Sequence, residues 1–317
     1  FFMLPLLREL EHSYIVRCND APRSLRAWRD VAQEFPPDAA QYAQSGTLPS
    51  RQLSGVSGDL GMAILWIVQA TIVRLFIRDI IAAASGYHSR MANISATDIG
   101  ALAHSEDRDS PVTIEETADS IVLSGTKKYI TGGSAADFLL ITARRKGDDG
   151  ATKLVFLPRE YLPSGAIIDL SLSLLRTTPH ASLKLNDLEL PREQLVMIEP
   201  AALRRALKVW GIVERGLITE SFVGLCLYCS QKLQGKIPIC VSFVDLFGSL
   251  LTQTSASALD MLRAALNQHR VHERIPFAEI VQAYSDFKNE LSKNSSALSP
   301  EISLRLEDLT LFEKIRF

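Results

Sequence analysis

The sequence predicts an α+β multidomain protein in which a β domain lies between two helical segments. Apolar residues recur at helical spacing near the start of the chain, short strand-like runs occupy the middle, and long helical stripes follow. We therefore expect an N-terminal helical domain over residues 1–98, a middle antiparallel β-barrel or sandwich domain over 99–198, and a C-terminal helical bundle over 199–317.

The N-terminal segment has helical periodicity followed by a loop-like composition. From Glu34 to Asp59 the chain is rich in Pro, Ser, Gly and Gln, so we expect a long loop there. The periodic apolar residues are Leu4, Leu7 and Leu10, and then Leu25, Trp28, Val31 and Ala32.

The run Gly61–Val73 contains only uncharged residues, and Arg74 follows it at once. A membrane-spanning helix needs about 20 predominantly apolar residues, which is more than this run provides. We expect a buried helix that continues to about Ala84, and no membrane span.

The middle segment consists of short runs rich in β-forming residues, separated by Gly, Asp, Asn and Pro. No helix-length periodic segment lies between these runs, which favours an antiparallel barrel or sandwich over a βαβ sheet. The expected strands cover Val112–Glu116, Ile121–Ser124, Phe138–Ala143, Lys153–Leu157 and Ser182–Asn186.

Helical periodicity returns after Pro200. We expect a helix from about Leu203 to Gln234 and then two helices whose apolar stripes pack in a bundle. One stripe is Phe243, Phe247, Leu250, Leu251, Thr254, Ala258, Met261, Leu262 and Ala265, and the other is Phe277, Ile280, Val281, Tyr284, Phe287 and Leu291.

Composition and charge favour small-molecule ligands. The net charge is −2 with acids and bases mixed along the chain, which argues against a nucleic-acid-binding surface. Cys226 and Cys229 lie in an apolar helical stretch and are expected in the core, so a reducing, cytoplasmic location is predicted. His269, His272 and Glu273 have a metal-like spacing beside arginines, but solvated surface is the favoured interpretation and no metal is predicted.

The stretch Gly125–Gly133 is the candidate site. It closes a predicted strand and ends in two glycines, which places Tyr129 and Thr131 at a strand end. An aromatic face can stack on a planar ring, and a nearby hydroxyl can donate a hydrogen bond to it. The same pattern also fits a strand-end tyrosine that only packs, with its hydroxyl in water.

Together with the order of helices, strands and helices, three local matches resemble the acyl-CoA dehydrogenase family. Ser124–Gly133 resembles the family segment NG-x-K-x-(W/Y)-I-T-(N/G)-(G/A). Leu175–Pro191 is similar to the strand that closes the family's β domain and begins R-x-S-x-T. Leu102–Asp107 stands at the place of the family's T-(E/S)-P strand end.

The resemblance implies an FAD site. Family members place the aromatic residue near the isoalloxazine and hydrogen-bond the threonine to the reactive nitrogen of the flavin. Tyr129 and Thr131 would take these roles with Ile130 between them, and Ser105 would contact the pyrimidine edge. From the residues alone, Ser105 is equally a turn serine, and Arg176 is either an anion ligand or a salt-bridged surface residue.

Part of the family pattern is absent. In the family's R-x-x-F-G-x-x-(I/L) segment the arginine reaches the pyrophosphate of a neighbouring subunit's flavin, but Gln231 and Gln234 occupy the Arg and Phe positions here. Lys232 offers a substitute charge as a flexible point charge rather than a fork. The family's (Q/H)-G-G-x-G element is not found.

The sequence identifies no catalytic residue. The glutamate near the family's E-G-T is not found, and the base position that some members have on the earlier helix falls on Arg204 or Arg205. Arginine cannot act as a base at neutral pH, and Glu214 is the nearest carboxylate downstream. The end of the chain from Arg305 is similar to the family helix that precedes the base, so the base is either lost or lies in a further segment.

The resemblance implies an FAD-dependent oxidoreductase that dehydrogenates an acyl-CoA thioester at its α,β bond in fatty acid metabolism. Alternatives are a non-catalytic paralogue that keeps the fold for ligand binding or assembly, and a flavin monooxygenase or oxidase. Implied partners are an acyl-CoA or related small molecule, an electron-transfer partner, and further copies of the chain in a homodimer or homotetramer.

Overall fold

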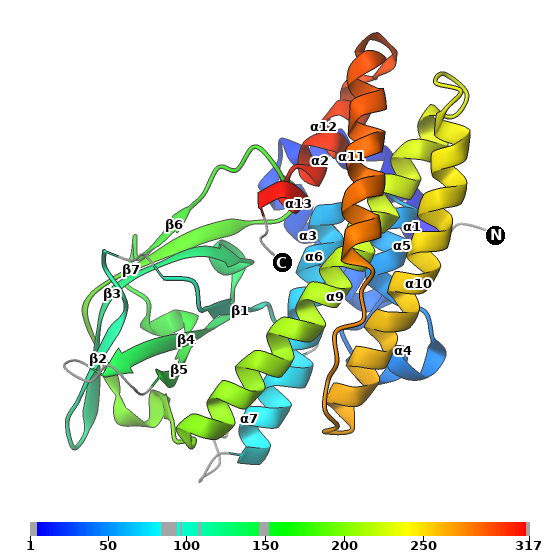
Figure 1. Ribbon diagram of the computed structural model, residues 1–317. Helices are drawn as coiled ribbons and strands as arrows, with labels where there is room; N and C mark the ends of the chain where they lie inside the picture. Colours follow the sequence, from blue (N-terminus) through cyan, green and yellow to red (C-terminus); the bar gives the residue numbers. More distant parts are fainter. Residues whose placement is uncertain (1–4, 84–93, 96, 107–108, 146–151, 315–317) are drawn as a thin grey trace. The chain divides into compact units, whose positions relative to one another are not determined.

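The computed structural model describes residues 5–83, 94–95, 97–106, 109–145 and 152–314. The order of helices, strands and helices is confirmed (Figure 1). By compactness the chain divides into two units, which are described separately. The helical unit comprises residues 1–67, 173–177 and 211–317, and the sheet unit comprises residues 68–172 and 178–210.

The helical unit begins with short helices. Two of them, α4 and α5, lie within Glu34–Asp59, so the predicted long loop is wrong. Asp38 caps α4 by accepting from two backbone N–H groups, and Pro49 opens α5 at its first position, where a missing N–H costs nothing. The first helices are α1 (Pro5–His12), α2 (Tyr14–Cys18), α3 (Ala21–Glu34), α4 (Ala39–Ser45), α5 (Pro49–Gly55) and α6 (Leu60–Val68).

The C-terminal helices pack along the predicted stripes. Every residue of the first stripe is buried on α10, and Phe287 of α11 contacts the rings of Phe243 and Phe247 at 5.2 and 5.4 Å between centroids. In the second stripe Val281 is half-exposed, contrary to expectation. These helices are α9 (Pro200–Leu233), α10 (Cys240–Leu266), α11 (Phe277–Lys293), α12 (Pro300–Leu309) and α13 (Leu311–Lys314).

The sheet unit starts with a π-helical segment, η1 (Gln69–Phe76), and α7 (Ile77–Ala83), which continue the helix begun by α6. The stretch Leu60–Ile80 is long and apolar enough to cross a membrane, but 94% of its most apolar 18 residues are buried inside the protein. This is the environment of a core helix, as the sequence predicts. Gln69 joins it to the sheet, because its amide both donates to and accepts from the backbone of Gly100 at 2.8 Å.

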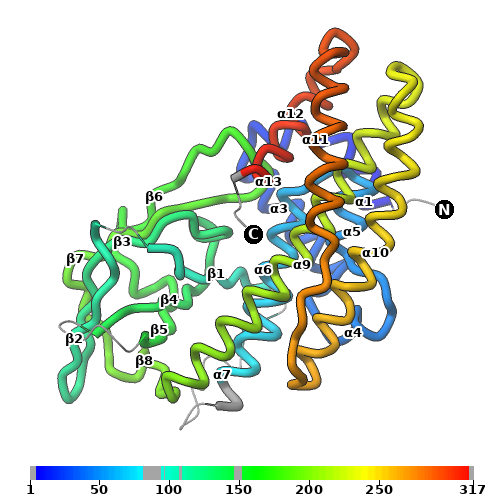
Figure 2. Tube along the Cα trace, viewed as in Figure 1, coloured from blue at the N-terminus to red at the C-terminus, as the bar shows by residue number. Residues whose placement is uncertain are grey.

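Eight strands form one sheet in the order β6-β7-β3-β2-β4-β5-β8, with β1 also paired to β4 (Figures 1 and 2). Most pairs are antiparallel as predicted, but β1 and β2 both run parallel to β4 along the same edge. The strands are β1 (Gly100–Ala103), β2 (Thr113–Glu116), β3 (Ser120–Thr131), β4 (Phe138–Arg145), β5 (Thr152–Pro158), β6 (Ile167–Asp169), β7 (His180–Pro191) and β8 (Leu195–Val196).

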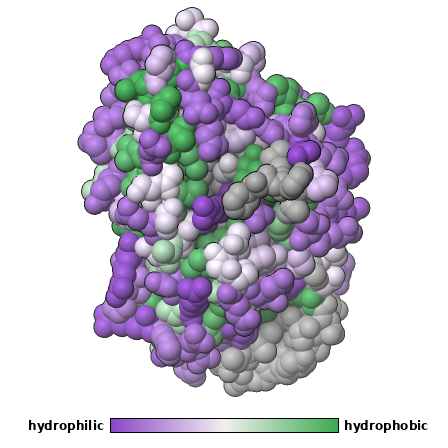
Figure 3. Space-filling view, turned by 90° about the vertical axis from the view of Figure 1, so that its right-hand side faces the viewer, coloured by the Kyte–Doolittle hydropathy of each residue, from purple (hydrophilic) through white to green (hydrophobic). Residues whose placement is uncertain are grey.

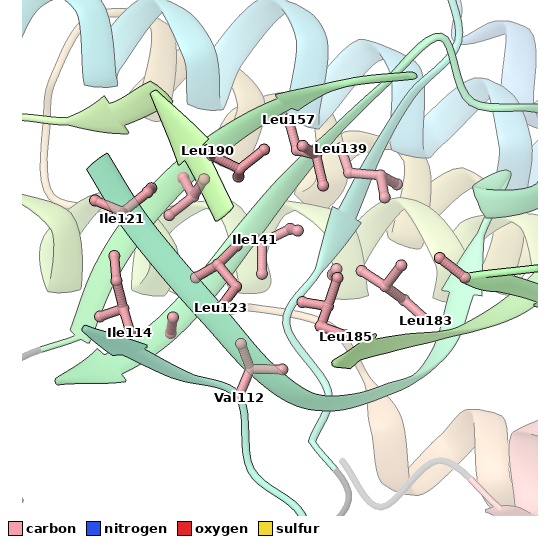
Figure 4. Close-up of a cluster of buried hydrophobic side chains, with 14 of the residues drawn as sticks. Val112, Ile114, Ile121, Leu123, Leu139, Ile141, Leu157, Leu183, Leu185 and Leu190 are labelled. Carbon is pink, nitrogen blue, oxygen red and sulfur yellow. The ribbon is translucent and has the colours of Figure 1, made fainter. Parts of the chain in front are cut away.

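The core of the sheet unit is built from aliphatic side chains of facing strands. Figure 4 shows Leu123 of β3, Ile141 of β4 and Leu185 of β7 pointing toward a common interior. Each of them is at most 3% exposed. Because successive strand residues face opposite sides, this core determines which positions of β3 remain for the surface.

The face of the molecule shown in Figure 3 is mostly hydrophilic, with hydrophobic residues in narrow strips. Among the described residues, the large apolar side chains exposed on α10 are Val241 and Leu246. Single exposed apolar residues of this kind are normal for protein surfaces.

Candidate functional site

A β-bulge shapes the end of β3. Between the paired positions Lys127 and Ile130, β3 has one residue more than β7 opposite. Strict alternation would place Tyr129 on the same face as Lys127, which is fully buried. The extra residue changes the phase, so Lys127 and Ile130 both point inward and Tyr129 points to the surface with 66% of its area exposed.

Tyr129 has a left-handed backbone conformation, with φ of 58°. This region is uncommon for a large side chain and costs on the order of 1–2 kcal/mol. Its hydroxyl makes no hydrogen bond within the described residues. The bulge therefore presents an aromatic face that is free for a planar ligand.

Thr131 is the last residue of β3 and pairs with His180 of β7. Thr131 is half-buried, and its hydroxyl has no protein partner in the described part of the chain. The strand ends there because Gly132 takes φ of 77° and donates its N–H to the carbonyl of Pro179 at 2.7 Å. Thr131 thus offers a positioned but unused hydroxyl.

Two buried polar side chains lie opposite the end of β3. One belongs to His180, the strand partner of Thr131, and the other to Thr178, two residues earlier in the chain. Among the described residues, the Nε2 atom of His180 and the Oγ1 atom of Thr178 have no hydrogen-bond partner. Burial lowers the pKa of His180 to about 4, so its ring is neutral at pH 7. Buried polar groups are normally paired, and such orphans fit a site that receives a polar ligand.

Ser105 follows β1 and is exposed. Its carbonyl accepts from the backbone N–H of Lys128 at 3.1 Å, which joins the end of β1 to the bulge of β3. The structure therefore brings Ser105 beside the strand end that carries Tyr129 and Thr131. Ile130 is 1% exposed with its side chain in the core, which leaves only its main chain for a ligand.

A buried charge that no sequence motif indicates lies beneath this strand end. The ammonium of Lys127 lies 3.0 Å from the carboxylate of Glu106, 3.2 Å from the hydroxyl of Thr142 and 3.3 Å from the carbonyl of His104. Burial lowers the pKa of Lys127, whereas the Glu106 carboxylate raises it. Lysines are rarely buried without a partner, but no spacing in the sequence identifies Glu106 as that partner.

In the helical unit, α9 carries two carboxyl groups with raised pKa values. Burial raises the pKa of both Glu214 and Glu220 to about 7. Glu220 is fully enclosed and accepts from Ser50 at 3.2 Å and Ser255 at 2.5 Å. Glu214 is partly exposed and has no hydrogen bond in the described residues, and Arg215 opposes its shift.

Both candidate anion ligands have protein partners. Lys232 pairs with Glu11 at 2.5 Å and lies 5.3 Å from the centre of the Tyr228 ring. Arg176 is exposed and pairs with Glu307 at 3.1 Å, so the salt-bridged interpretation holds. Neither side chain is a free cation.

Cys226 and Cys229 are buried free thiols on α9. Glu273 pairs with Arg215 at 3.4 Å. In the part of the chain that the structure describes, no group of three His, Cys, Asp or Glu residues is placed to hold a metal ion.

The sequence matches no protein-family model and is not similar to any curated protein. Solved structures do resemble it. Butyryl-CoA dehydrogenase from Megasphaera elsdenii has a TM-score of 0.67 at 12% identity over 98% of this chain and 94% of that one. PigA in complex with FAD has a TM-score of 0.66 at 15% identity over 98% and 93%. Glutaryl-CoA dehydrogenase from Mycobacterium smegmatis has a TM-score of 0.57 at 17% identity over 91% and 88%. The chain therefore has the acyl-CoA dehydrogenase fold.

Proposed function

We propose that this chain binds FAD at the end of β3 and catalyses the α,β-dehydrogenation of an acyl-CoA thioester. The observation that supports it best is the bulge that exposes Tyr129 in a left-handed conformation near Thr131, whose hydroxyl has no partner among the described residues. A strained residue held in an exposed position is a common feature of functional sites. Structural neighbours include acyl-CoA dehydrogenases and a protein whose structure contains FAD.

The residues at this strand end fit an isoalloxazine ring. Tyr129 would stack on the ring, Thr131 would donate a hydrogen bond to its edge, and Ser105 and the main chain of Ile130 would contact the pyrimidine side. The cofactor, when bound, supplies a hydride acceptor. The hydrogen bonds that the protein makes to its ring set how readily it accepts the hydride.

Glu214 is the candidate base for the α-proton. A general base works best when its pKa is near the working pH, and burial raises the pKa of Glu214 to about 7. Glu220 has a similar pKa, but two serine hydroxyls and complete burial close it to a substrate. Partial exposure is what separates Glu214 from Glu220.

The cofactor test uses the purified protein and two threonine variants. We expect a yellow protein that releases FAD on denaturation. Thr131→Val removes the hydroxyl at constant shape and should weaken FAD binding about fivefold, which corresponds to one hydrogen bond of about 1 kcal/mol. Titration of the apoprotein with FAD, followed by flavin fluorescence, measures this.

Thr152→Val is the matched control, because Thr152 is also half-buried but begins β5. It should bind FAD like the wild type. A colourless protein that cannot be reconstituted with FAD would contradict the proposal, as would equal effects of the two variants.

A non-catalytic, ligand-binding protein is the second candidate. The pairing of Lys232 with Glu11 favours it, since that lysine is not free to replace the family's phosphate arginine. Anaerobic bleaching of the flavin by an acyl-CoA would exclude it.

A flavin monooxygenase or oxidase is the third candidate. One of the PigA structures is of that protein with FAD and proline, so a structural neighbour has been solved with a small molecule that is not an acyl-CoA. Substrate-dependent oxygen consumption would favour this alternative over the dehydrogenase.

A further inference from the structure

His104 lies between β1 and Ser105, and it is exposed. Its ring is nevertheless held in place. The Nδ1 atom is 3.0 Å from the hydroxyl oxygen of Thr142 on β4, and the ring packs edge-to-face with Trp210, with 6.5 Å between centroids and 83° between planes. A hydrogen bond and an aromatic contact thus fix the orientation of the His104 ring.

Lys127 favours one of the two neutral tautomers of His104. The Lys127 ammonium has only donors, so the Thr142 oxygen accepts from it at 3.2 Å. The oxygen keeps one further lone pair, so Nδ1 of His104 at 3.0 Å either accepts the hydroxyl proton of Thr142 or donates to that lone pair while the hydroxyl donates to the carbonyl of Ala103 at 3.5 Å. The first arrangement is favoured, because a 3.5 Å contact is long for a hydrogen bond and a second donor would converge on an oxygen that already faces the Lys127 ammonium. With Nδ1 accepting, a neutral imidazole carries its proton on Nε2.

The His104 ring is neutral at pH 7. Desolvation lowers its pKa and the positive charge of Lys127 lowers it further, while the Glu106 carboxylate acts in the opposite direction. Arg144 is the other charged group here, and it pairs with Glu106 at 3.3 Å. The Nε2–H group makes no hydrogen bond within the described residues, so His104 presents an oriented donor without a protein partner.

We propose that His104 is a ligand-binding residue whose Nε2–H donates to a carbonyl or ring-nitrogen acceptor of the molecule held at Ser105, with Thr142 and Lys127 as its positioning residues. The identity of that molecule as a flavin rests on the proposed function. Ser105 is the next residue along the chain and is tied to the bulge of β3, so a planar ligand on Tyr129 extends toward the same end of β1.

Two substitutions of His104 separate its two nitrogens. In His104→Gln the side-chain amide reaches the place of Nε2, and in His104→Asn it reaches only the place of Nδ1. We expect the Gln variant to bind FAD within about twofold of the wild type. The Asn variant keeps a partner for Thr142 but loses the outward donor, so it should bind about fivefold more weakly. Fluorescence titration of the apoproteins measures both.

The tautomer is checked without any flavin. Nitrogen-15 NMR of the histidine rings in the free protein, with His104 assigned by its substitution, should show the proton on Nε2. In Thr142→Val the hydroxyl is replaced by a methyl group, and the His104 signal should shift to a mixture of tautomers. A proton on Nδ1 in the wild type overturns the proposal. If His104→Asn does not fold, this NMR result on the wild type still tests the proposal.

The two proposals fail in different ways. If the wild type takes up no FAD, the proposed function is overturned and the inference falls with it. If the wild type binds FAD and the Asn and Gln variants bind equally well, the inference alone is overturned and the flavin site stands.

Discussion

Tyr129 combines two properties that stability alone does not favour. It holds a large side chain at φ of 58°, and 66% of the residue's area is exposed to water. Glycine would adopt this backbone conformation at no steric cost. The retention of an aromatic residue at this point is understandable if its ring has a ligand to contact.

Replacing Tyr129 with glycine tests whether its ring contacts a ligand at the expense of backbone strain. We expect Tyr129→Gly to raise the free energy of unfolding by up to about 1 kcal/mol, because the left-handed strain is relieved, or to leave it unchanged. FAD affinity should fall by about tenfold as the stacking surface is lost. Urea unfolding and flavin titration provide the two numbers.

Ile168→Ala is a suitable comparison, since Ile168 is an exposed apolar residue of β6 in the same sheet. It should change neither quantity appreciably. A Tyr129→Gly protein that is much less stable than the wild type would show that the ring has a packing role.

Glu214 gives a prediction for turnover. Glu214→Gln should abolish dehydrogenation while FAD remains bound, because the amide cannot accept the α-proton. In the wild type, kcat/KM should rise with pH through about 7, since the carboxyl group must be ionised to act as a base. Steady-state rates from pH 5.5 to 8.5 measure the profile.

Glu220→Gln is the matched control on the same helix. It should retain turnover and change mainly stability, because its partners are buried serines. If Glu214→Gln turns over substrate at the wild-type rate, the base lies elsewhere.

At the scale of elements, β3 depends on a close backbone crossing near its middle. Gly125 has φ of 129°, and a Cβ there would lie 2.4 Å from the carbonyl oxygen of Pro111. No side chain fits without moving the segment that leads into β2. The strand that carries Tyr129 and Thr131 therefore requires glycine at this position.

Gly125→Ala should lower the free energy of unfolding by about 3 kcal/mol, from left-handed strain together with the clash. Gly165→Ala is the control, since Gly165 has φ of 80° but open space around its Cβ position. It should cost only about 1 kcal/mol. Chemical denaturation of both variants tests the difference, and equal losses would show that the crossing at Pro111 relaxes easily.

At the scale of the molecule, the helical unit is assembled around buried polar groups from distant parts of the sequence. Asp308 accepts from the hydroxyl of Tyr14 at 2.9 Å and from the backbone N–H of Leu175 at 2.5 Å. Asp59 accepts from Thr177 at 2.6 Å. These contacts explain why residues 173–177 belong to the helical unit although the chain on both sides belongs to the sheet unit.

Buried carboxyl groups make the stability of this unit depend on pH. Burial raises the pKa of Asp308 and Glu220 to about 7 in the folded state, above the values of 3.8 and 4.5 expected in the unfolded chain. Their stabilisation is complete below pH 4 and is lost as the pH rises through about 7, because the unfolded chain ionises first. The ionisation of each group should lower the free energy of unfolding by about 3–4 kcal/mol between pH 4 and pH 8.

Glu220→Gln removes one of these titrations. Relative to the wild type, its free energy of unfolding should fall less between pH 5 and pH 8 in urea unfolding experiments. Glu279→Gln, at an exposed position of α11, should keep the wild-type slope. Parallel slopes for all three proteins would contradict the prediction.

The sequence by itself determined the order of elements and the position of the candidate site. Periodicity is a local property, so the stripes of α10 and α11 and the strands around Gly125–Gly133 were readable from neighbouring residues. Two helices in Glu34–Asp59 were missed because loop-like composition outweighed the capping signals of Asp38 and Pro49.

The tertiary structure decided the features that depend on partners far away in the chain. The bulge that turns Tyr129 outward exists only in the register between β3 and β7, and the parallel pairing of β1 with β4 brings Ala103 beside Ile141. The ammonium of Lys127 contacts Glu106 and Thr142, which come from different segments. Hydrogen bonds between segments distant in sequence leave no periodic trace, and for that reason the sequence indicated the strand end where we propose that a ligand binds but not how that strand end is built.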